Sequence, residues 1–299
     1  MKKYILLLLG SFLLASVAYA ADSQIWGEMR VENILAYGKE GSLKLGSLFT
    51  MLQSNYFAKI FLAILVGVPS VFLLHYLVIG PKVFSHDGKK IYAFNIFHRI
   101  VHQIAAISFI VLVPTGFIMT FGSTFGGGEF VRMMKDLHGL ATVTFAIVVI
   151  PMFLMWLKNM LPTFDDIKWM MIVGGYLSKV KRPVPAGKFN AGQKAWYWFA
   201  TLGGMVMILT GAIMYFMDFN IPMINEVTGL SQIDLLRASA ILHAVVGFVI
   251  VALFFTHIYM AVFAIKGAIH SIITGYKEEE EVKILHSSWY KKLKKEGKV

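Results

Sequence analysis

The chain has 299 residues, 57% of them hydrophobic, with a formal net charge of +11 and a mean hydropathy of +0.67. Soluble domains are only about 45 to 50% apolar, and the basic residues here lie in loops between apolar spans, so the composition indicates an integral membrane protein and argues against nucleic-acid binding. The absence of cysteine excludes disulfides, iron–sulfur clusters ligated by this chain and covalent haem attachment through a C-x-x-C-H sequence.

The first twenty residues are typical of a cleavable secretory signal. They contain a Lys2-Lys3 head, an apolar core from Ile5 to Leu14 and the small-residue ending Ala18-Tyr19-Ala20. We therefore expect a signal peptide at 1–20, followed by a polar periplasmic segment at 21–55. An uncleaved anchor is the alternative.

Apolar stretches long enough to cross a bilayer, about 20 residues each, follow along the chain. The first is a transmembrane helix expected at 56–80, and four more are expected at 96–121, 137–157, 195–217 and 236–270. No series of alternating ten-residue strands is present, which disfavours a barrel. The predicted fold class is therefore all-α integral membrane, ending in a charged cytoplasmic tail at 276–299 that is helical or disordered.

Lysine and arginine residues are distributed unevenly over the connecting segments. One set holds six of them and comprises 21–55, 122–136 and 218–237. The other set holds nineteen and comprises 81–99, 158–194 and 266–299. The positive-inside bias places the second set in the cytoplasm, and a secreted N-terminus independently places the first set outside. We expect a multi-pass protein of the bacterial inner membrane, with the mature N-terminus periplasmic and the C-terminus cytoplasmic.

Two histidines share the last apolar span. His243 and His257 are fourteen residues apart, which corresponds to nearly four helical turns and about 21 Å, so both imidazoles leave the same helix face at two depths. Ionisable residues inside a membrane span indicate function by default. Axial ligation of two haems, one near each membrane surface, is the use that this spacing favours.

The expected orientation gives the remaining histidines a depth. His138 lies near the outer side, as does His243, whereas His98 and His102 lie near the inner side, as does His257. A single histidine near the end of a span is more often interfacial than a ligand, but four at two matched depths favour ligation. Because His98 and His102 are four residues apart on one helix face, spacing does not choose between them. The others are expected to be interfacial or solvated: His75, His86, His270 and His286.

Small and basic residues accompany these histidines. Thr115-Gly116 in the second span has a counterpart in Thr210-Gly211 in the fourth, and such glycines admit either a haem plane or a neighbouring helix. Basic residues near the expected haem levels are possible partners of haem propionates, or else interfacial anchors: Arg99, Arg237 and Lys266.

A polar loop, Lys188-Phe189-Asn190-Ala191-Gly192-Gln193-Lys194, precedes the fourth span on the cytoplasmic side. Its side-chain and backbone amides are suited to hydrogen-bonding a quinone carbonyl near the depth of His257. The same residue types also form turns and helix caps.

Together, this loop and the pattern Arg237-x5-His243-x13-His257-Ile258-Tyr259-Met260-Ala261, followed by Lys266-Gly267, resemble the cytochrome b (gamma) subunit of membrane-bound formate dehydrogenases. The resemblance covers roughly 94–275. The chain is also similar, more loosely, to cytochrome b subunits of hydrogenases and thiosulfate reductases.

The resemblance implies a four-helix di-haem cytochrome b domain at 94–275. It implies that His102 and His257 ligate an inner haem b, and that His138 and His243 ligate an outer one. It also implies a menaquinone site at Asn190 and Gly192 beside His257, to which we add Gln193. The implied partners are a periplasmic catalytic molybdenum or tungsten subunit and an iron–sulfur subunit.

The expected function is therefore electron transfer from a periplasmic iron–sulfur subunit through two haems to menaquinone, with formate oxidised in another subunit. The helix at 56–80 has no counterpart in the short form of the family. The first alternative is the cytochrome b subunit of a hydrogenase or of a thiosulfate or sulfur reductase. An alternative of another class is a histidine-containing transporter or membrane anchor without haem, although no inverted repeat with broken helices is evident.

Overall fold

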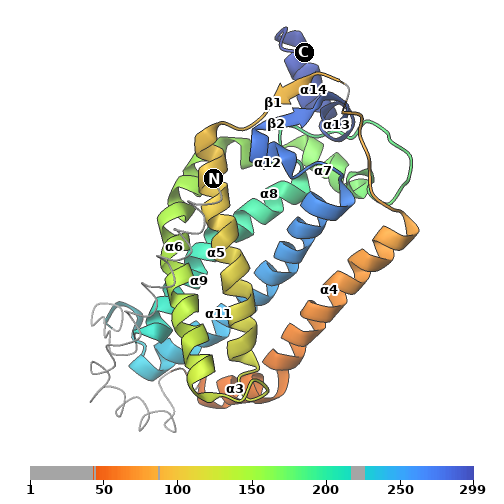
Figure 1. Cartoon of the computed structure of the whole chain (residues 1–299). Helices are drawn as coiled ribbons and strands as arrows, with labels where there is room; N and C mark the ends of the chain where they lie inside the picture. Colours follow the sequence, from red (N-terminus) through yellow and green to blue (C-terminus); the bar gives the residue numbers. More distant parts are fainter. Residues whose placement is uncertain (1–42, 44, 87, 217–225) are drawn as a thin grey trace. The chain divides into compact units, whose positions relative to one another are not determined.

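The computed structural model describes residues 43, 45–86, 88–216 and 226–299, which are mostly helical (Figure 1). Within this part of the chain, five apolar helical stretches are long enough to cross a membrane: Leu45–Val78, Ile96–Thr120, Gly128–Met160, Ala191–Tyr215 and Gln232–Ala264. The prediction of an all-α, multi-pass membrane protein is thereby confirmed. The predicted signal peptide and most of the 21–55 segment lie outside the described residues.

The first stretch consists of α3 (Leu45–Leu52), a π-helical turn (Gln53–Phe57) and α4 (Ala58–Val78). It begins inside the range predicted as a polar segment, because Leu45–Leu52 is apolar enough to be helical. The helix α5 (Ile96–Thr120) follows, and the Asn95 side chain caps it by accepting a 2.8 Å hydrogen bond from His98 N.

The helix α6 (Gly128–Met160) begins nine residues before the predicted span, since Glu129 to Asp136 continue the helix although four of these eight residues are charged. The short α7 (Phe164–Met171) and α8 (Ala191–Trp198) come next, and a π-helical turn (Phe199–Gly203) joins α8 to α9 (Gly204–Tyr215). The last long helix is α11 (Gln232–Ile258), which another π-helical turn extends (Tyr259–Ala264).

The chain divides into two compact units, and the long helices contribute one part to each. Unit 1 comprises the described residues of Met1–Ile60 together with Ala105–Ile147 and Val206–Gly247. Phe109 and Phe145 pack edge to face in it, with ring centroids 5.1 Å apart. The buried carboxylate of Asp234 accepts hydrogen bonds from Leu43 N at 3.1 Å and Ser231 Oγ at 2.8 Å.

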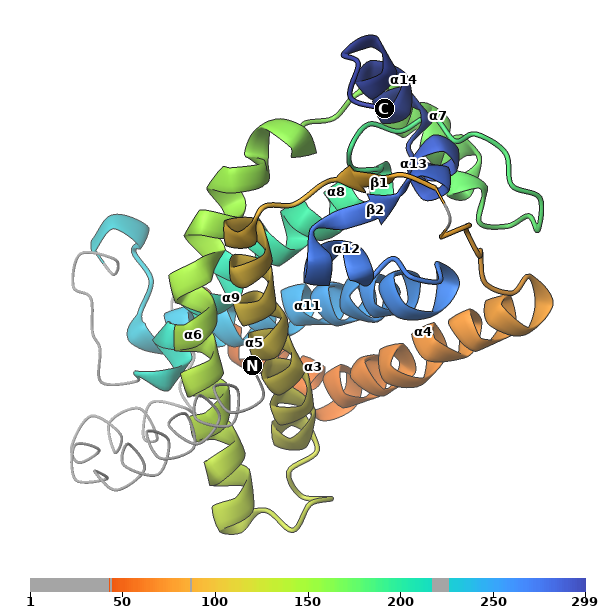
Figure 2. The same cartoon turned by 45° about the horizontal axis from the view of Figure 1, so that its top comes forward.

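Unit 2 comprises Phe61–Ile104, Val148–Met205 and Phe248–Val299. It contains a two-stranded antiparallel sheet in which β1 (Lys90–Tyr92) pairs with β2 (Tyr276–Glu278), Ile91 lying opposite Lys277 (Figure 2). The short helix α12 (His270–Thr274) leads into β2 through Gly275, whose φ of +93° and close approach to Phe94 O require glycine.

The tail is folded onto this sheet. It forms α13 (Glu279–Leu285) and α14 (Ser287–Lys295), and Val282 and Leu293 pack with Ile91 in a small core. The expectation that His286 is solvated was wrong: the residue is only 2% exposed, and its Nδ1 donates a 2.9 Å hydrogen bond to Gly187 O. Burial lowers the pKa of His286 to about 4, so the ring is neutral at pH 7.

His75 fixes α4 inside unit 2. Its Nε2 donates to Tyr176 O at 2.9 Å, and its Nδ1 accepts a 2.6 Å hydrogen bond from the Tyr259 hydroxyl. Phe72, one turn earlier, stacks on the Tyr259 ring with centroids 4.4 Å apart. The helix α4 is therefore attached to the rest of unit 2 through polar and aromatic contacts near its C-terminal end.

Candidate functional site: two histidine pairs

The first pair lies in unit 1 and is built from α5, α6, α9 and α11. The Thr115 hydroxyl of α5 donates to Val111 O at 2.7 Å, so it accepts the hydrogen of His138 Nδ1, which lies 2.8 Å away. A histidine whose Nδ1 carries and donates the hydrogen keeps its lone pair on Nε2. The hydroxyl of Thr115 therefore selects the tautomer of His138 that can ligate a metal through Nε2.

The arrangement is repeated on α9 and α11. The Thr210 hydroxyl donates to Val206 O at 2.7 Å and lies 2.9 Å from His243 Nδ1. His243 and His138 are close enough to interact electrostatically. Unit 1 thus contains two neighbouring imidazoles, each oriented by a threonine and each with a free Nε2 lone pair.

The glycine after each threonine makes room for the imidazole. A Cβ added to Gly116 would lie 3.6 Å from His138 Cε1, and one added to Gly211 would lie 3.4 Å from His243 Cε1. Both distances are ordinary van der Waals contacts, so alanine would fit at either position, whereas a side chain larger than alanine would crowd the ring. Each glycine thus contacts a histidine ring, which is neither of the two neighbours, a haem plane or a packed helix, expected from the sequence.

The second pair lies in unit 2. The His102 and His257 ring centroids are 6.1 Å apart, and the planes are inclined by 53°. Trp196 stacks on His257 at 5.3 Å with an angle of 18°, and Trp156 contacts His102 edge-on at 6.5 Å. These two tryptophans pack against the histidines and limit the access of water to them.

Of the two candidates on α5, His102 is the one beside His257. The rings that neighbour His98 are Phe94 and Trp156, at 6.5 and 5.7 Å. The geometry thus favours His102, as the family resemblance implies.

Both pairs offer the imidazole ligands that haem iron takes, and the second pair also has the spacing. A metal–imidazole bond is about 2 Å long, so two imidazoles on opposite sides of one ion have centroids about 6 Å apart, close to the 6.1 Å between His102 and His257. Nδ1 of His102 is buried without a hydrogen bond to the described residues. Among those residues, no group of three or more His, Asp or Glu is placed to hold a metal ion.

The polar loop predicted to bind quinone forms the start of α8. Asn190 and Gln193 make a reciprocal capping box: Gln193 N donates to Asn190 Oδ1 at 2.9 Å, and Asn190 N donates to Gln193 Oε1 at 3.0 Å. Each side-chain oxygen is thus used, whereas each side-chain NH₂ remains available as a donor. A Cβ on Gly192 would lie 3.1 Å from Trp169 Cη2, so Trp169 packs over this turn.

A buried ion pair holds the same turn in place. Lys194 Nζ lies 2.6 Å from Asp166 Oδ2 and 3.0 Å from Leu161 O. Because a buried charge without its partner costs several kcal/mol, this pair fixes α7 against α8. The capping function and the ion pair explain much of the loop's composition without a ligand.

The three predicted partners of propionates differ in their surroundings. Arg99 is half-buried, and its Nη1 donates to Ile273 O at 2.6 Å. Arg237 is buried in unit 1, on the same helix as His243. Lys266 is exposed, with its Nζ 6.0 Å from the Tyr76 ring centroid.

Sequence reasoning missed the roles of several residues. The Thr-Gly repeat was interpreted through its glycines alone, although the threonine directly before each glycine was a usable signal. Trp156 and Trp196 gave none, since tryptophans near the ends of apolar spans are common at membrane interfaces. Trp169 gave none either, because it lies in the basic segment 158–194, outside the spans.

Comparison with known proteins gives a consistent result. The sequence profile of the family described as prokaryotic cytochrome b561 matches residues 93–275, more than half of the chain. The chain is 27% identical to the cytochrome b556(Fdn) subunit of nitrate-inducible formate dehydrogenase from Escherichia coli K12, over 70% of this chain and 94% of that protein. It is also 27% identical to the formate dehydrogenase cytochrome b556 subunit of Haemophilus influenzae, over 64% of this chain and 79% of that one.

Proposed function

Because this chain belongs to the prokaryotic cytochrome b561 family, we propose that it is the cytochrome b subunit of a membrane-bound formate dehydrogenase and passes electrons through two b haems to a quinone. The observation that carries the proposal is the presence of one histidine pair in each unit, each pair suited to axial ligation. Haem b, when bound, supplies reversible one-electron chemistry at its iron.

Each pair has a defined task. His138 and His243 hold the outer haem, while Thr115 and Thr210 fix their tautomers. His102 and His257 hold the inner haem, and Trp156 and Trp196 exclude water from their rings. The placement of the pairs toward opposite membrane surfaces is supported by the fourteen-residue spacing on α11 and the distribution of basic residues.

The propionates of the haems need cationic partners. Buried Arg237 is suited to the outer haem, since it lies on α11 six residues before His243. Arg99 and Lys266 belong to unit 2, and we assign them to the inner haem. Lys266 is exposed and so contributes less, because solvent screens its charge.

The quinone, proposed to be menaquinone, is assigned to the turn at Asn190, Gly192 and Gln193, with His257 as its neighbour in the membrane. The side-chain NH₂ of Asn190 and that of Gln193 are donors for a quinone carbonyl, since their oxygens are engaged in the capping box. Since this turn lies on the cytoplasmic side in the proposed orientation, quinone reduction there would take its protons from the cytoplasm.

The relatives' names support assembly with other subunits, and the family resemblance suggests which subunits these are. Each is described as a subunit of formate dehydrogenase, so we propose that this chain associates in the bacterial inner membrane with a periplasmic catalytic molybdenum or tungsten subunit and an iron–sulfur subunit. We also propose the following domain limits: a signal peptide at 1–20, a periplasmic segment at 21–55, the additional helix at 56–80, the di-haem domain at 94–275 and the tail at 276–299.

The donor is tested on the complex isolated from native membranes. We expect formate, but not hydrogen, to reduce the haem absorption bands within seconds, and we expect thiosulfate not to reoxidise the reduced haems. Reduction by hydrogen alone would assign the chain to a hydrogenase. A purified, folded chain with no haem bands would instead support a transporter or anchor.

A further inference from the structure

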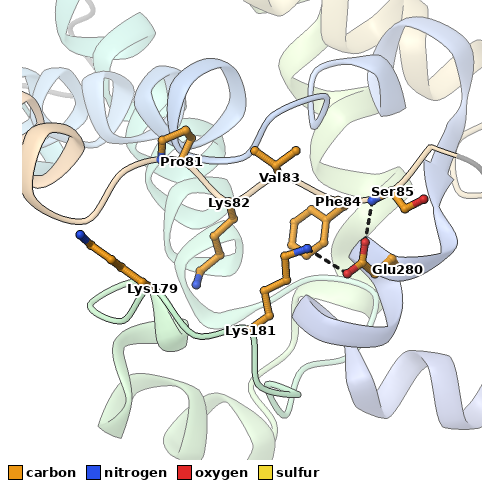
Figure 3. A pocket seen from close by; sticks show the side chains of 8 residues that line it. All are labelled: Pro81, Lys82, Val83, Phe84, Ser85, Lys179, Lys181 and Glu280. Carbon is orange, nitrogen blue, oxygen red and sulfur yellow. Dashed lines mark hydrogen bonds and ion pairs between the residues drawn. The ribbon is translucent and has the colours of Figure 1, made fainter.

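A basic pocket opens beside the end of α4, in unit 2. It has a volume of about 620 Å³, and its lining includes Lys82, Lys179, Lys181 and Glu280, together with the apolar Pro81 and Val83 (Figure 3). Parallel pairing of Lys82 with Ile265 holds its backbone wall, through Lys82 N to Ala264 O at 2.8 Å and Lys266 N to Lys82 O at 3.0 Å.

The charges in the pocket do not cancel. Lys181 Nζ lies 2.9 Å from Glu280 Oε1, and Ser85 N donates to the other Glu280 oxygen at 2.6 Å, so this lysine and this carboxylate neutralise each other (Figure 3). Lys82 Nζ donates only to the neutral Ser178 O, at 3.0 Å. Lys179 is exposed and forms no ion pair with the described residues. Two positive charges are therefore left over.

The surroundings of Lys82 destabilise its charged form. It is 8% exposed, and burial, followed by the nearby charge of Lys181, lowers its pKa. A buried ammonium next to another cation is stabilised by a bound anion. The pocket is therefore better suited to a negatively charged group than to water alone.

The surroundings of the pocket are apolar and exposed. Leu77 and Val78 end the membrane span, and Val83 follows in the pocket wall; all three are exposed. On the opposite loop, Leu177 and Val180 flank the lysines with 65% and 57% exposure. Exposed aliphatic side chains that alternate with lysines are typical of the level where headgroups meet acyl chains.

We propose that this pocket binds the phosphodiester headgroup of an anionic phospholipid, with Lys82 and Lys179 contacting the phosphate and the flanking aliphatic side chains contacting the acyl chains. Free phosphate would satisfy the lysines but not the apolar rim. The inference does not depend on haem or on the identity of the electron donor.

The test uses the purified full-length protein with its cofactors in neutral detergent, titrated with phosphatidylglycerol and followed by native mass spectrometry. Each lysine near a bilayer surface contributes about fivefold to the affinity for anionic lipid, so Lys82→Gln/Lys179→Gln should weaken binding about twenty- to thirtyfold. The matched control is Lys291→Gln/Lys295→Gln, which removes the same charge from the exposed face of α14 and should bind as the unaltered protein does.

Two results would overturn the proposal. One is unchanged affinity for phosphatidylglycerol in the double variant. The other is displacement of the lipid by inorganic phosphate at an equal concentration, which would identify a free-anion site. Should Lys82→Gln impair folding, Lys179→Gln alone, at an exposed position, is expected to weaken binding about fivefold.

Discussion

The hydroxyl of Thr115 lies 2.8 Å from Nδ1 of His138 and donates its own hydrogen to Val111 O. The threonine is therefore the acceptor, and the histidine is fixed with its Nε2 free. Thr210 and His243 repeat the relationship at 2.9 Å. Two helices from different parts of the chain thus supply the same orienting group to a histidine on a neighbouring helix.

Replacing Thr115 by valine keeps the shape of the side chain and removes the acceptor. Loss of such a partner typically weakens metal binding tenfold or more, so we expect about tenfold faster loss of the outer haem to apomyoglobin and a higher midpoint potential for that haem. Thr115→Ser should restore both. The control is Thr144→Val, which removes a comparable hydroxyl bonded to Leu140 O; an equal effect there would show that the role is only structural.

The pairing itself is tested with double substitutions. His138→Ala/His243→Ala should leave one haem per chain, as each single substitution should, because both residues serve the same site. His138→Ala/His257→Ala should leave none. Pyridine haemochrome assay gives the haem content, and equal haem loss in both double variants would refute the pairing.

The sequence was sufficient to predict the five membrane spans, because apolar length is a local property of the chain, and the spacing of the histidines indicated candidate ligands at two depths. Spacing alone did not distinguish His98 from His102 as the expected inner ligand, since both lie on one face of α5. Only packing distinguishes them: His102 contacts His257, and His98 contacts Phe94.

Features formed by distant segments were not predictable in this way. His286 lies in a charged tail, yet its hydrogen bond to Gly187 O, 99 residues earlier, buries it. Trp196 likewise reaches His257 from another helix. Neither contact leaves a periodic pattern in the sequence.

Asn190 has two possible functions, and two substitutions separate them. Asn190→Asp keeps an oxygen that caps α8 but removes the NH₂ donor, whereas Asn190→Ala removes both and should cost about 1 kcal/mol of stability. If the amide binds quinone, both variants should reduce menaquinone analogues at least tenfold more slowly while the donor still reduces the haems. Normal quinone kinetics in Asn190→Asp would show that the residue is only a cap.

The buried His286 makes the tail sensitive to acid. Its pKa is about 4 in the folded state and about 6.5 when exposed, so the unfolded tail binds more protons between these values and folding is weakened as the pH falls from 6.5 to 4. Hydrogen exchange of 276–299, corrected for intrinsic rates, should rise up to about tenfold per pH unit in that window. His286→Asn should abolish this pH dependence; its persistence would assign the effect to another group.

The central claim, that two histidine pairs each hold one haem, is tested most directly by the ratio of haem b to protein in the intact, full-length protein, combined with electron paramagnetic resonance of the oxidised form. We predict two haems per chain, both low-spin with two histidine ligands. A folded preparation with one haem, with none, or with a high-spin haem lacking a second histidine would contradict it.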